Sequence, residues 1–242
     1  MLVVKNVVKS IGNKEILHNI NFCLKKGQIV ALVGPNGAGK TTLMRLLSGF
    51  YKQEKGEISF DNHTIENNRL EYLKSIAYVP EHGGIYQDMS VFEFLRFMGD
   101  MKHIEKDMFK INIKKVIKNL ELESVVNQKC ETLSKGYKRR VAIAGAMLNE
   151  PKMLILDEPT EGLDPQQKLK LREVLQDYGK KNTILISTHI MEEVEAIATR
   201  VLMIKNGKLV CDSTPDDLKK ITAQNRIEES FYTILGDINE NK

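Results

Sequence analysis

The chain has 242 residues, of which 42% are hydrophobic and 28% are charged. This composition is ordinary for a globular protein with a buried core, and the length fits one large or one two-lobed unit better than a typical domain of roughly 100 to 150 residues. The net charge of +4 is small, and acidic and basic residues are mixed along the chain. Direct nucleic-acid binding is therefore not expected.

The cysteines and the apolar runs argue against disulfides and membrane spans. Cys23, Cys130 and Cys211 are far apart and odd in number, which is typical of reduced cytosolic thiols. The amino terminus, MLVVKNVVKS, resembles a strand and not a signal peptide. No apolar run approaches the roughly 20 residues that cross a bilayer, so we expect a soluble protein that reaches a membrane only through a partner.

Short apolar runs predict the strands of an α/β fold. Residues 28–34, 152–158 and 182–188 are nearly continuous apolar runs, each followed by helix-like sequence. Such runs are typical of parallel strands that are covered on both faces. FDNHTI at residues 60–65 and MIKNGKLV at residues 203–210 predict antiparallel hairpins, the second with Asn-Gly at its turn.

The sequence GPNGAGKTT follows the first of these predicted strands. It matches G-x-x-x-x-G-K-[ST], whose backbone N–H groups and helix start surround phosphate oxygens. Lys40 is expected to reach the β- and γ-phosphates, and Thr41 to place its hydroxyl on Mg²⁺. A chance glycine-rich turn is the alternative, and the strand–loop–helix context argues against it. The predicted nucleotide-binding residues are Gly34, Pro35, Asn36, Gly37, Ala38, Gly39, Lys40, Thr41 and Thr42.

The segment from about residue 85 to 149 lacks a convincing strand and carries several amphipathic stretches. We predict a helical subdomain inserted between two halves of one α/β core. In DMSVFEFLRFMGDM, residues 88–101, the apolar side chains cover more than one helical face. Either the helix is wholly used in packing, or it forms a groove for a short helix of a membrane partner. These side chains are Phe92, Phe94, Leu95, Phe97 and Met98.

The stretch LSKGYKRR, residues 133–140, joins a serine and a glycine to a cluster of positive charge. It can bind an anion but holds no group for chemistry of its own. Ser134 is predicted to cap a helix that runs to about residue 149, and Gly136 would let a phosphate approach the backbone. Arg139 and Arg140 fit either a phosphate contact or a solvated or salt-bridged face. The expected buried face of this helix holds Tyr137, Val141, Ala144 and Leu148.

Two adjacent carboxylates end the predicted strand in LILDEPTEGLDP, residues 154–165. Asp157 fits the strand-end aspartate that holds Mg²⁺ through water. Glu158 would project differently, toward a water in line with the γ-phosphate. An acid pair at a helix N-terminus is the alternative, but together with the phosphate loop the pair predicts a nucleotide hydrolase.

His189 follows the apolar run 182–188, so we expect it at the carboxyl edge of the sheet, where α/β proteins bind ligands. A lone histidine is usually a satisfied polar group, and this is the interpretation given to His18, His63, His82 and His103. From residue 214 onward the sequence predicts two short helices.

These motifs resemble, in order and over nearly the entire chain, the ATP-binding subunits of ABC transporters. GPNGAGKT resembles the Walker A loop, LILDE the Walker B strand, LSKGYKRR the ABC signature and EGLD the D-loop. His189 matches the switch histidine. The resemblance implies a P-loop NTPase core with a mainly parallel sheet, an amino-terminal antiparallel β part and an inserted α-helical subdomain. The parts would be the first half of the core (1–84), the helical subdomain (85–149), the second half (150–213) and carboxyl-terminal helices (214–242).

The family also implies cofactors, roles and partners. ATP and Mg²⁺ would be bound, with Lys40, Glu158 and His189 catalytic. The signature would contact the γ-phosphate of ATP held by the opposite subunit, so a homodimer or a paired nucleotide-binding subunit is expected. Membrane permease subunits would hold the protein at the cytoplasmic face of the cell membrane. The residues expected to act across the dimer are Ser134, Lys135 and Gly136, together with Asp164 of the D-loop.

Three departures from the family pattern qualify these expectations. Ile11 aligns with the tyrosine that stacks on adenine, which removes a contact of about 0.5–1.5 kcal/mol, so we expect weaker selectivity for adenine. Glu81 aligns with the Q-loop glutamine and can still meet Mg²⁺ or its water. The signature has Lys135 and Tyr137 in place of glycine and glutamine. The lysine and Glu81 resemble subunits of drug, antibiotic, sodium and gliding-machinery systems, which favours export.

Two other classes of protein are weighed against a transporter subunit. Soluble ABC ATPases of translation carry two cassettes in one chain, and those of DNA maintenance split the core with long coiled coils, neither of which this sequence has. A non-hydrolysing nucleotide-binding regulator is disfavoured by the intact Lys40, Asp157, Glu158 and His189. The transported substrate is read by the permease and cannot be predicted here.

Overall fold

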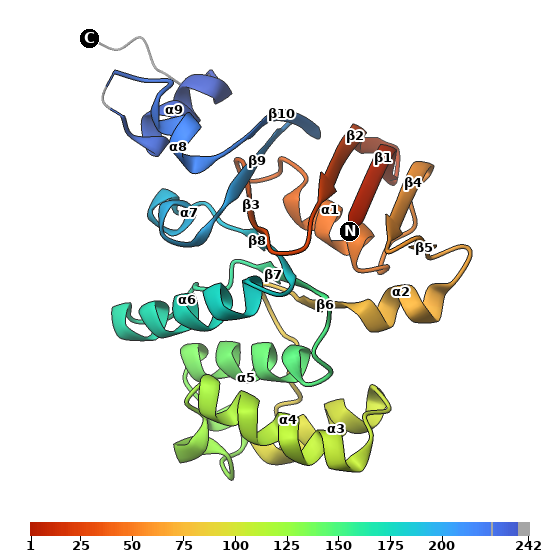
Figure 1. Cartoon of the computed structure of the whole chain (residues 1–242), viewed down its shortest axis with the longest axis vertical. Helices are drawn as coiled ribbons and strands as arrows, with labels where there is room; N and C mark the ends of the chain where they lie inside the picture. The colour runs from red at the N-terminus through yellow and green to blue at the C-terminus, as the bar shows by residue number, and fades with distance from the viewer. Residues whose placement is uncertain (224, 237–242) are drawn as a thin grey trace.

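The computed structural model describes residues 1–223 and 225–236. These residues form two β-sheets with helices around them (Figure 1), in strand orders β2-β1-β4-β5 and β10-β9-β3-β8-β7-β6. The strands are β1 (Leu2–Ile11), β2 (Lys14–Leu24), β3 (Ile29–Val33), β4 (Lys55–Phe60), β5 (His63–Thr64), β6 (Ile76–Val79), β7 (Met153–Asp157), β8 (Thr183–Ser187), β9 (Arg200–Lys205) and β10 (Lys208–Ser213).

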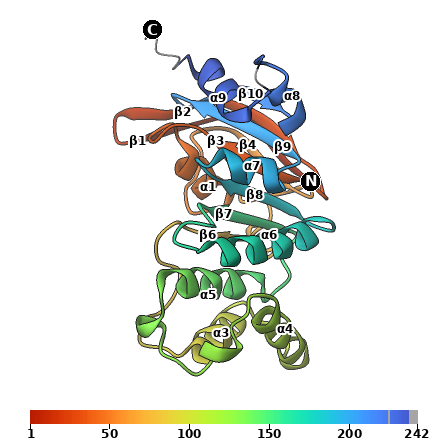
Figure 2. The same cartoon turned by 90° about the vertical axis from the view of Figure 1, so that its left-hand side faces the viewer.

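Helices cover the second sheet and form both ends of the molecule (Figures 1 and 2). Short 3-10 turns at Glu123–Val125 and Cys130–Thr132 join α4 to α5. The helices are α1 (Lys40–Leu47), α2 (Arg69–Ser75), α3 (Val91–Met101), α4 (Lys106–Asn119), α5 (Lys135–Met147), α6 (Pro165–Gly179), α7 (Met191–Ile197), α8 (Pro215–Lys219) and α9 (Ile227–Leu235).

The larger sheet is parallel except at one edge. Strands β9, β3, β8, β7 and β6 run parallel, and β10 adds an antiparallel edge strand. Every residue of β3, β7 and β8 is buried, because both faces of the sheet are covered, and this explains their continuous apolar runs. The predicted α/β fold, with its antiparallel amino-terminal sheet, is confirmed.

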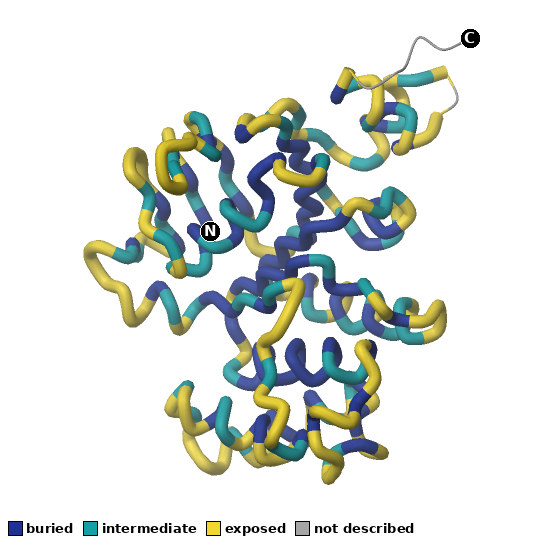
Figure 3. Tube along the Cα trace, turned by 180° about the vertical axis from the view of Figure 1, so that it is seen from behind, coloured by how far each residue is buried: buried dark blue, intermediate teal, exposed yellow. Residues whose placement is uncertain are grey.

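Alternate residues of β3 face two different cores. Val30 and Leu32 join the cluster that contains α1 and the antiparallel sheet. Ala31 and Val33 join the cluster built with α3 to α7. Figure 3 shows the result as a buried spine along the parallel sheet, with exposed turns around it. Helix α1 is thereby held between the two sheets, which fixes where the loop before it must lie.

Helices α3, α4 and α5 gather at one end of the molecule, and α8 and α9 lie at the other (Figures 1 and 2). Residues 85–149 form no strand, as predicted, apart from one isolated bridge. The division of the chain into four parts stays a prediction, and residues 224 and 237–242 of its last part lie outside the described residues. Along the rest of the chain, no helix has the length and apolarity needed to span a membrane.

Both hairpins are confirmed, and one strand went unpredicted. Phe60 pairs with His63, and Asn206 and Gly207 both have positive φ, of 47° and 72°, as a tight turn with Asn-Gly allows. Strand β6 has only four residues and was not predicted, although it forms an edge of the parallel sheet.

The aromatic stretch of α3 is used partly in packing. Phe94 and Leu95 are buried, whereas Phe92 is 42% exposed. The ring of Phe97 lies edge-on to Tyr86, with centroids 5.1 Å apart. Internal packing therefore accounts for one face of α3, and the groove for a partner helix stays a prediction.

A buried amine joins the ends of α3 and α5. Lys102 donates to the carbonyl of Ala146 at 3.1 Å and to Asn149 Oδ1 at 2.6 Å. Burial lowers the pKa of Lys102 from an ordinary value of 10.5 to about 8. A charged amine is therefore held at the junction of two helices at neutral pH, where burial disfavours the charge.

We predict that the wild type gains stability relative to Lys102→Met as the pH rises from 8 to 10.5. Below pH 8 both the folded and unfolded states hold the proton, and the folded state bears the cost of a buried charge. Between these values the folded state releases its proton first, so the free energy of unfolding should rise by up to about 3 kcal/mol. Urea unfolding at several pH values measures this. The exposed Lys110→Met should give a flat difference, and a flat difference for Lys102→Met would contradict the prediction.

Candidate active site

The loop of residues 34–39 joins β3 to α1, and its glycines are required by geometry. A Cβ on Gly34 would lie 2.2 Å from the carbonyl oxygen of Ile204, so only glycine lets the loop pass this close to β9. Gly39, which starts α1, has φ of 109°, a conformation that side chains disfavour. The predicted strand–loop–helix arrangement is thus present, with the loop at the carboxyl end of a buried strand.

Lys40 lies over this loop. Its Nζ donates to the carbonyl of Gly34 at 2.7 Å and to that of Pro35 at 3.2 Å. Burial lowers the pKa of Lys40, while the negative charges of Glu158 and Asp157 oppose that shift. The ammonium is therefore close to both the loop and the paired acids, as a phosphate-binding cation must be.

Asp157 ends β7 and is 2% exposed. Its Oδ2 accepts from Thr41 at 3.0 Å and from the Tyr78 hydroxyl at 3.4 Å, and its Oδ1 accepts from Ser187 Oγ. Burial and the Asp157 charge raise the pKa of Tyr78 to about 12, so its hydroxyl stays a donor at neutral pH. Hydroxyl and carboxylate oxygens are the ligands that Mg²⁺ prefers, so Thr41 and Asp157 fit such an ion.

Glu158 and His189 meet at the same edge of the sheet. His189 Nδ1 lies 3.1 Å from Glu158 Oε2, with the glutamate side chain 11% and the histidine 62% exposed. Glu158 has φ of 49°, and its N–H donates to Ser187 Oγ at 2.9 Å. Burial raises the pKa of Glu158, and the contact with His189 opposes the shift. A half-buried carboxylate with a raised pKa is suited to accept a proton from water.

A second buried carboxylate behind this pair was missed by sequence reasoning. Glu193 on α7 is 1% exposed and accepts from Thr188 Oγ1 at 2.9 Å and from the Thr160 hydroxyl. Thr188 precedes His189, and Thr160 lies two residues after Glu158. Glu193 thus joins the segments that carry the two candidate catalytic groups. Acids on a short amphipathic helix gave no signal that one of them would be buried.

Ser187 and Tyr78 were also missed, because each lies within an apolar run and looks like part of a strand. Ser187 is the β8 residue in register with Asp157, and Tyr78 lies on β6, next to β7. Had the pairing of β7 with β8 been predicted, it would have placed Ser187 next to Asp157 and indicated a hydrogen bond between them.

The signature and the D-loop pack against each other within one chain. Ser134 caps α5 through the N–H of Tyr137, as predicted. A Cβ on Gly136 would lie 2.4 Å from Gln167 Oε1 and 3.2 Å from Leu163 Cδ2. Lys135 Nζ pairs with Glu161 at 2.6 Å. A side chain at residue 136 would therefore have to displace the Gln167 side chain of its own chain.

Asp164 is exposed and caps α6 by accepting a hydrogen bond from the N–H of Gln167 at 2.8 Å. Ile11, at the end of β1, is 48% exposed and pairs with Lys14 at the hairpin tip. The predicted role of Asp164 across a dimer and the predicted contact of Ile11 with the adenine base both stay predictions.

For the signature arginines a solvated face is wrong, whereas the expected salt bridge is present at Arg140, whose Nη1 lies 3.6 Å from Glu121 Oε2. Arg139 is 7% and Arg140 4% exposed, so neither lies on a solvated face. Arg139 donates to the carbonyls of Pro80, just after β6, and of Asp157, at the end of β7, and Arg140 donates to those of Leu120 and Glu121. Because these guanidinium groups are engaged by carbonyls inside the chain, they are not free to bind phosphate.

Glu81 lies near Glu158 and, among the described residues, makes no hydrogen bond to Asp157. A cavity of about 240 Å³ is lined by Glu81 and Glu158 together with Lys135 and Arg139. Among the described residues, Glu81, His82 and Glu161 also bring ligand atoms within 4.8 Å of one another. Glu161 is already neutralised there by Lys135. A magnesium role for Glu81 stays a prediction.

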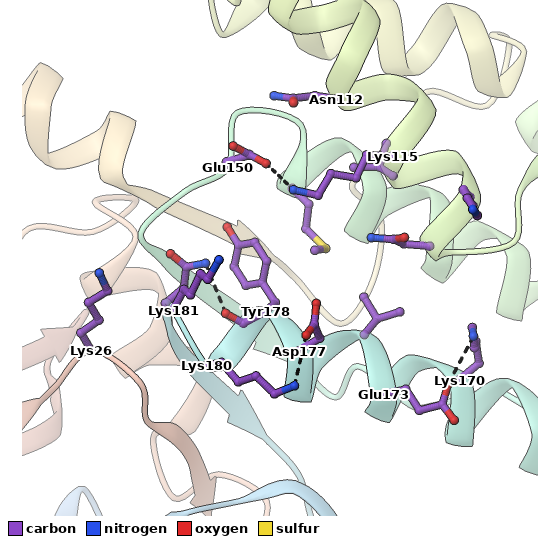
Figure 4. A pocket seen from close by; sticks show the side chains of 16 residues that line it. Lys26, Asn112, Lys115, Glu150, Lys170, Glu173, Asp177, Tyr178, Lys180 and Lys181 are labelled. Carbon is purple, nitrogen blue, oxygen red and sulfur yellow. Dashed lines mark hydrogen bonds and ion pairs between the residues drawn. The ribbon is translucent and has the colours of Figure 1, made fainter.

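A cavity of about 710 Å³ lies elsewhere, between α4 and α5 on one side and α6 on the other (Figure 4). Its walls alternate lysines with carboxylates, and Lys115–Glu150 at 2.6 Å and Lys180–Asp177 at 3.3 Å form ion pairs. None of the predicted site residues lines it. Exposed pairs of this kind are typical of a solvated surface, so the chemistry belongs to the carboxyl edge of the sheet.

Comparisons with known proteins agree with this location of the site. The ABC transporter family model matches residues 17–161. The lantibiotic transport ATP-binding protein SrtF of Streptococcus pyogenes is 33% identical over 232 residues, 96% of each chain. The SkfA peptide export ATP-binding protein SkfE of Bacillus subtilis (strain 168) is 36% identical over 213 residues, 88% of each chain. The spermidine/putrescine import ATP-binding protein PotA of Clostridium novyi (strain NT) is 35% identical over 224 residues, 90% of this chain and 63% of that one.

Solved structures give the same answer. An ATP-binding subunit of an ABC transporter has a TM-score of 0.89 at 27% identity, over 97% of this chain and 99% of that one. The dimeric ATP-binding cassette MJ0796, in a post-hydrolysis state with ADP and Pi, has a TM-score of 0.79 at 26% identity, over 88% and 98%. The chain belongs to the ABC transporter family. It is an ATP-binding subunit that hydrolyses ATP.

We predict that Glu193→Ala destabilises the fold more than removal of any exposed acid on α7. The change leaves two buried threonine hydroxyls without an acceptor, at about 1–3 kcal/mol each. Urea unfolding gives the difference. The matched control is Glu192→Ala, because the Glu192 side chain is 81% exposed and its one ion pair among the described residues is with Arg172 at 3.2 Å. Equal midpoints for the two variants would contradict the assigned role of Glu193.

Proposed function

We propose that this subunit drives export through separate membrane permease subunits, with ATP held between two nucleotide-binding subunits. The observation that carries the proposal is the convergence of Lys40, the Thr41–Asp157 pair and the Glu158–His189 pair at one edge of the sheet. These groups supply a cation for phosphate oxygens, a set of oxygen ligands and a base. A binding-only regulator would need no buried carboxylate poised beside a histidine.

Each group has a part in hydrolysis of the γ-phosphate. Lys40 neutralises charge on the phosphates, and the loop N–H groups orient them. Glu158 accepts hydrogen bonds from the attacking water, and its raised pKa makes it a better proton acceptor. His189, whose Nδ1 lies 3.1 Å from Glu158 Oε2, orients the Glu158 carboxylate. Thr41 and Asp157 would hold Mg²⁺, with Glu81 proposed as a further ligand, and the ion would supply positive charge for the phosphate oxygens.

The signature is proposed to complete the site of a second subunit. Ser134 and Lys135 are exposed at the start of α5, where backbone N–H groups favour an anion. They belong to α5, whereas the phosphate loop belongs to the opposite side of the parallel sheet core. A homodimer or a pair with a related subunit would bring a signature to each loop, as the dimeric form of the similar cassette suggests.

Export is favoured over import by two features. Lys135 and Glu81 are the residues that resemble export-type subunits, and two of the similar proteins are named for lantibiotic transport and peptide export. The similar protein named for polyamine import is the reason the direction needs a test. The permease would place the subunit at the cytoplasmic face of the membrane. Co-purification with a membrane protein, followed by ATP-dependent uptake into inside-out vesicles, tests both claims.

We predict that Glu158→Gln keeps ATP binding but lowers turnover by at least about 10²-fold, because the water loses its base. Lys40→Ala should instead weaken ATP binding itself. Phosphate release measures turnover, and titration with a fluorescent ATP analogue measures binding. Turnover near wild type in Glu158→Gln would remove this residue from catalysis.

A signature variant tests action across a dimer. In the Glu158→Gln background, ATP and Mg²⁺ should cause a dimer to accumulate on size exclusion. Lys135→Glu should abolish this dimer, because the glutamate would face the partner's γ-phosphate, and like charges at a closed interface cost about 3 kcal/mol or more. Lys135 serves better than Gly136, since Gly136→Asp would also press on Gln167 of its own chain.

Lys138→Glu is the matched control, because Lys138 donates to the carbonyl of Glu131 within its own chain. It should dimerise, and both variants should bind the ATP analogue as monomers. Dimerisation of Lys135→Glu at the control level would mean that the signature does not contact the partner's nucleotide.

A further inference from the structure

Arg139 makes an unusual set of contacts for a residue next to the signature. It lies on α5 just after Ser134–Gly136 and is 7% exposed. Nη1 donates to the carbonyl of Pro80, with that of Glu81 at 3.4 Å, and Nη2 donates to the carbonyl of Asp157. Nε lies 3.4 Å from the carbonyl of Pro159. One guanidinium therefore holds four backbone carbonyls.

These carbonyls belong to the chain's own ATP site. Pro80 and Glu81 follow β6, and Asp157 ends the neighbouring parallel strand β7, with Pro159 just beyond it. The same two segments carry Glu81 and Glu158, which line one cavity with Arg139. Because a guanidinium is planar and its donors form a fixed fork, it cannot follow one segment without moving the other.

We propose that Arg139 is a positioning residue that couples the two nucleotide sites of the dimer. This rests on the proposed function, in which the start of α5 contacts ATP held by the partner. When Ser134 and Lys135 engage that nucleotide, α5 shifts, and Arg139 carries the shift to Glu81 and to the Asp157–Glu158 segment. Binding at one site thereby sets the geometry of the base at the other.

Arg140 provides a matched control. It is the next residue of α5 and is equally buried, at 4% exposed. Its Nη1 donates to the carbonyls of Leu120 and Glu121 at 2.8 and 3.3 Å, and its guanidinium lies 4.3 Å from the ring centre of Tyr137. All these partners lie within the helical segment 85–149, so Arg140 stabilises α5 without reaching the ATP site.

The experiment measures turnover against ATP concentration for the wild type, Arg139→Lys and Arg140→Lys. A wild-type dimer with two coupled sites should give a Hill coefficient above 1, up to about 2. Arg139→Lys keeps the charge but loses the fork, so its Hill coefficient should fall to about 1. Its kcat should fall about 10- to 100-fold, because the base is no longer held in place. Binding of a fluorescent ATP analogue to the monomer should not change.

A merely structural role predicts a different result. Arg139→Lys and Arg140→Lys would then lower the melting temperature and turnover alike, and both would stay cooperative. That outcome overturns the proposal, as does retained cooperativity in Arg139→Lys. Arg139→Gln, which keeps two donors, is the second variant if the lysine variant does not fold, with the same expected loss of cooperativity. If Glu158→Gln forms no ATP-dependent dimer and the wild type is not cooperative, the proposed function itself is overturned, and this inference with it. If Glu158→Gln dimerises but the wild type is not cooperative, this inference alone is overturned.

Discussion

The buried carboxylate of Asp157 is the group on which the rest of the site depends. A charge that is 2% exposed must be compensated by donors, and removal of its partners would be costly. The donors come from three other segments: Thr41 on α1, Ser187 on β8 and Tyr78 on β6. The end of β7 is therefore fixed to the phosphate loop's helix and to both neighbouring strands. The pairing of β6, β7 and β8 therefore also brings Tyr78 and Ser187 to Asp157.

This constraint explains why the next residue can be catalytic. Asp157 is turned inward by its hydroxyl donors, and Glu158, with φ of 49°, turns out of the strand toward His189. Ser187 serves both residues, since it donates to Asp157 and accepts from the N–H of Glu158. Behind them Glu193 joins the segments that follow β7 and β8. Backbone geometry and buried polar contacts thus position Glu158, the proposed base.

The sequence predicts those parts of the fold and site whose signal is local. Apolar runs predict β3, β7 and β8 because strands covered on both faces need no alternation. The phosphate loop and the Asp157–Glu158 pair lie at strand ends and are visible as motifs. The roles of Ser187, Tyr78 and Glu193 could not be predicted, because each role depends on which residues the folded sheet brings next to that side chain. The burial of Arg139 and Arg140 could not be predicted for the same reason. Their carbonyl partners lie far away in the chain, and the local pattern of charge does not indicate them.

The packing of α5 shows why signature residues are hard to interpret from charge alone. Gly136 fits against Gln167 and Leu163, and Lys135 pairs with Glu161, so the signature and the D-loop form one unit before any partner arrives. An exposed ion pair of this kind stabilises little, so Lys135 can leave Glu161 for a phosphate at small cost. Release of Glu161 would in turn free the turn before Asp164, because the lysine side chain lies across Gly162. When nucleotide held by one subunit binds Lys135 of the other, the D-loop that loosens is therefore the one in the chain that carries Lys135.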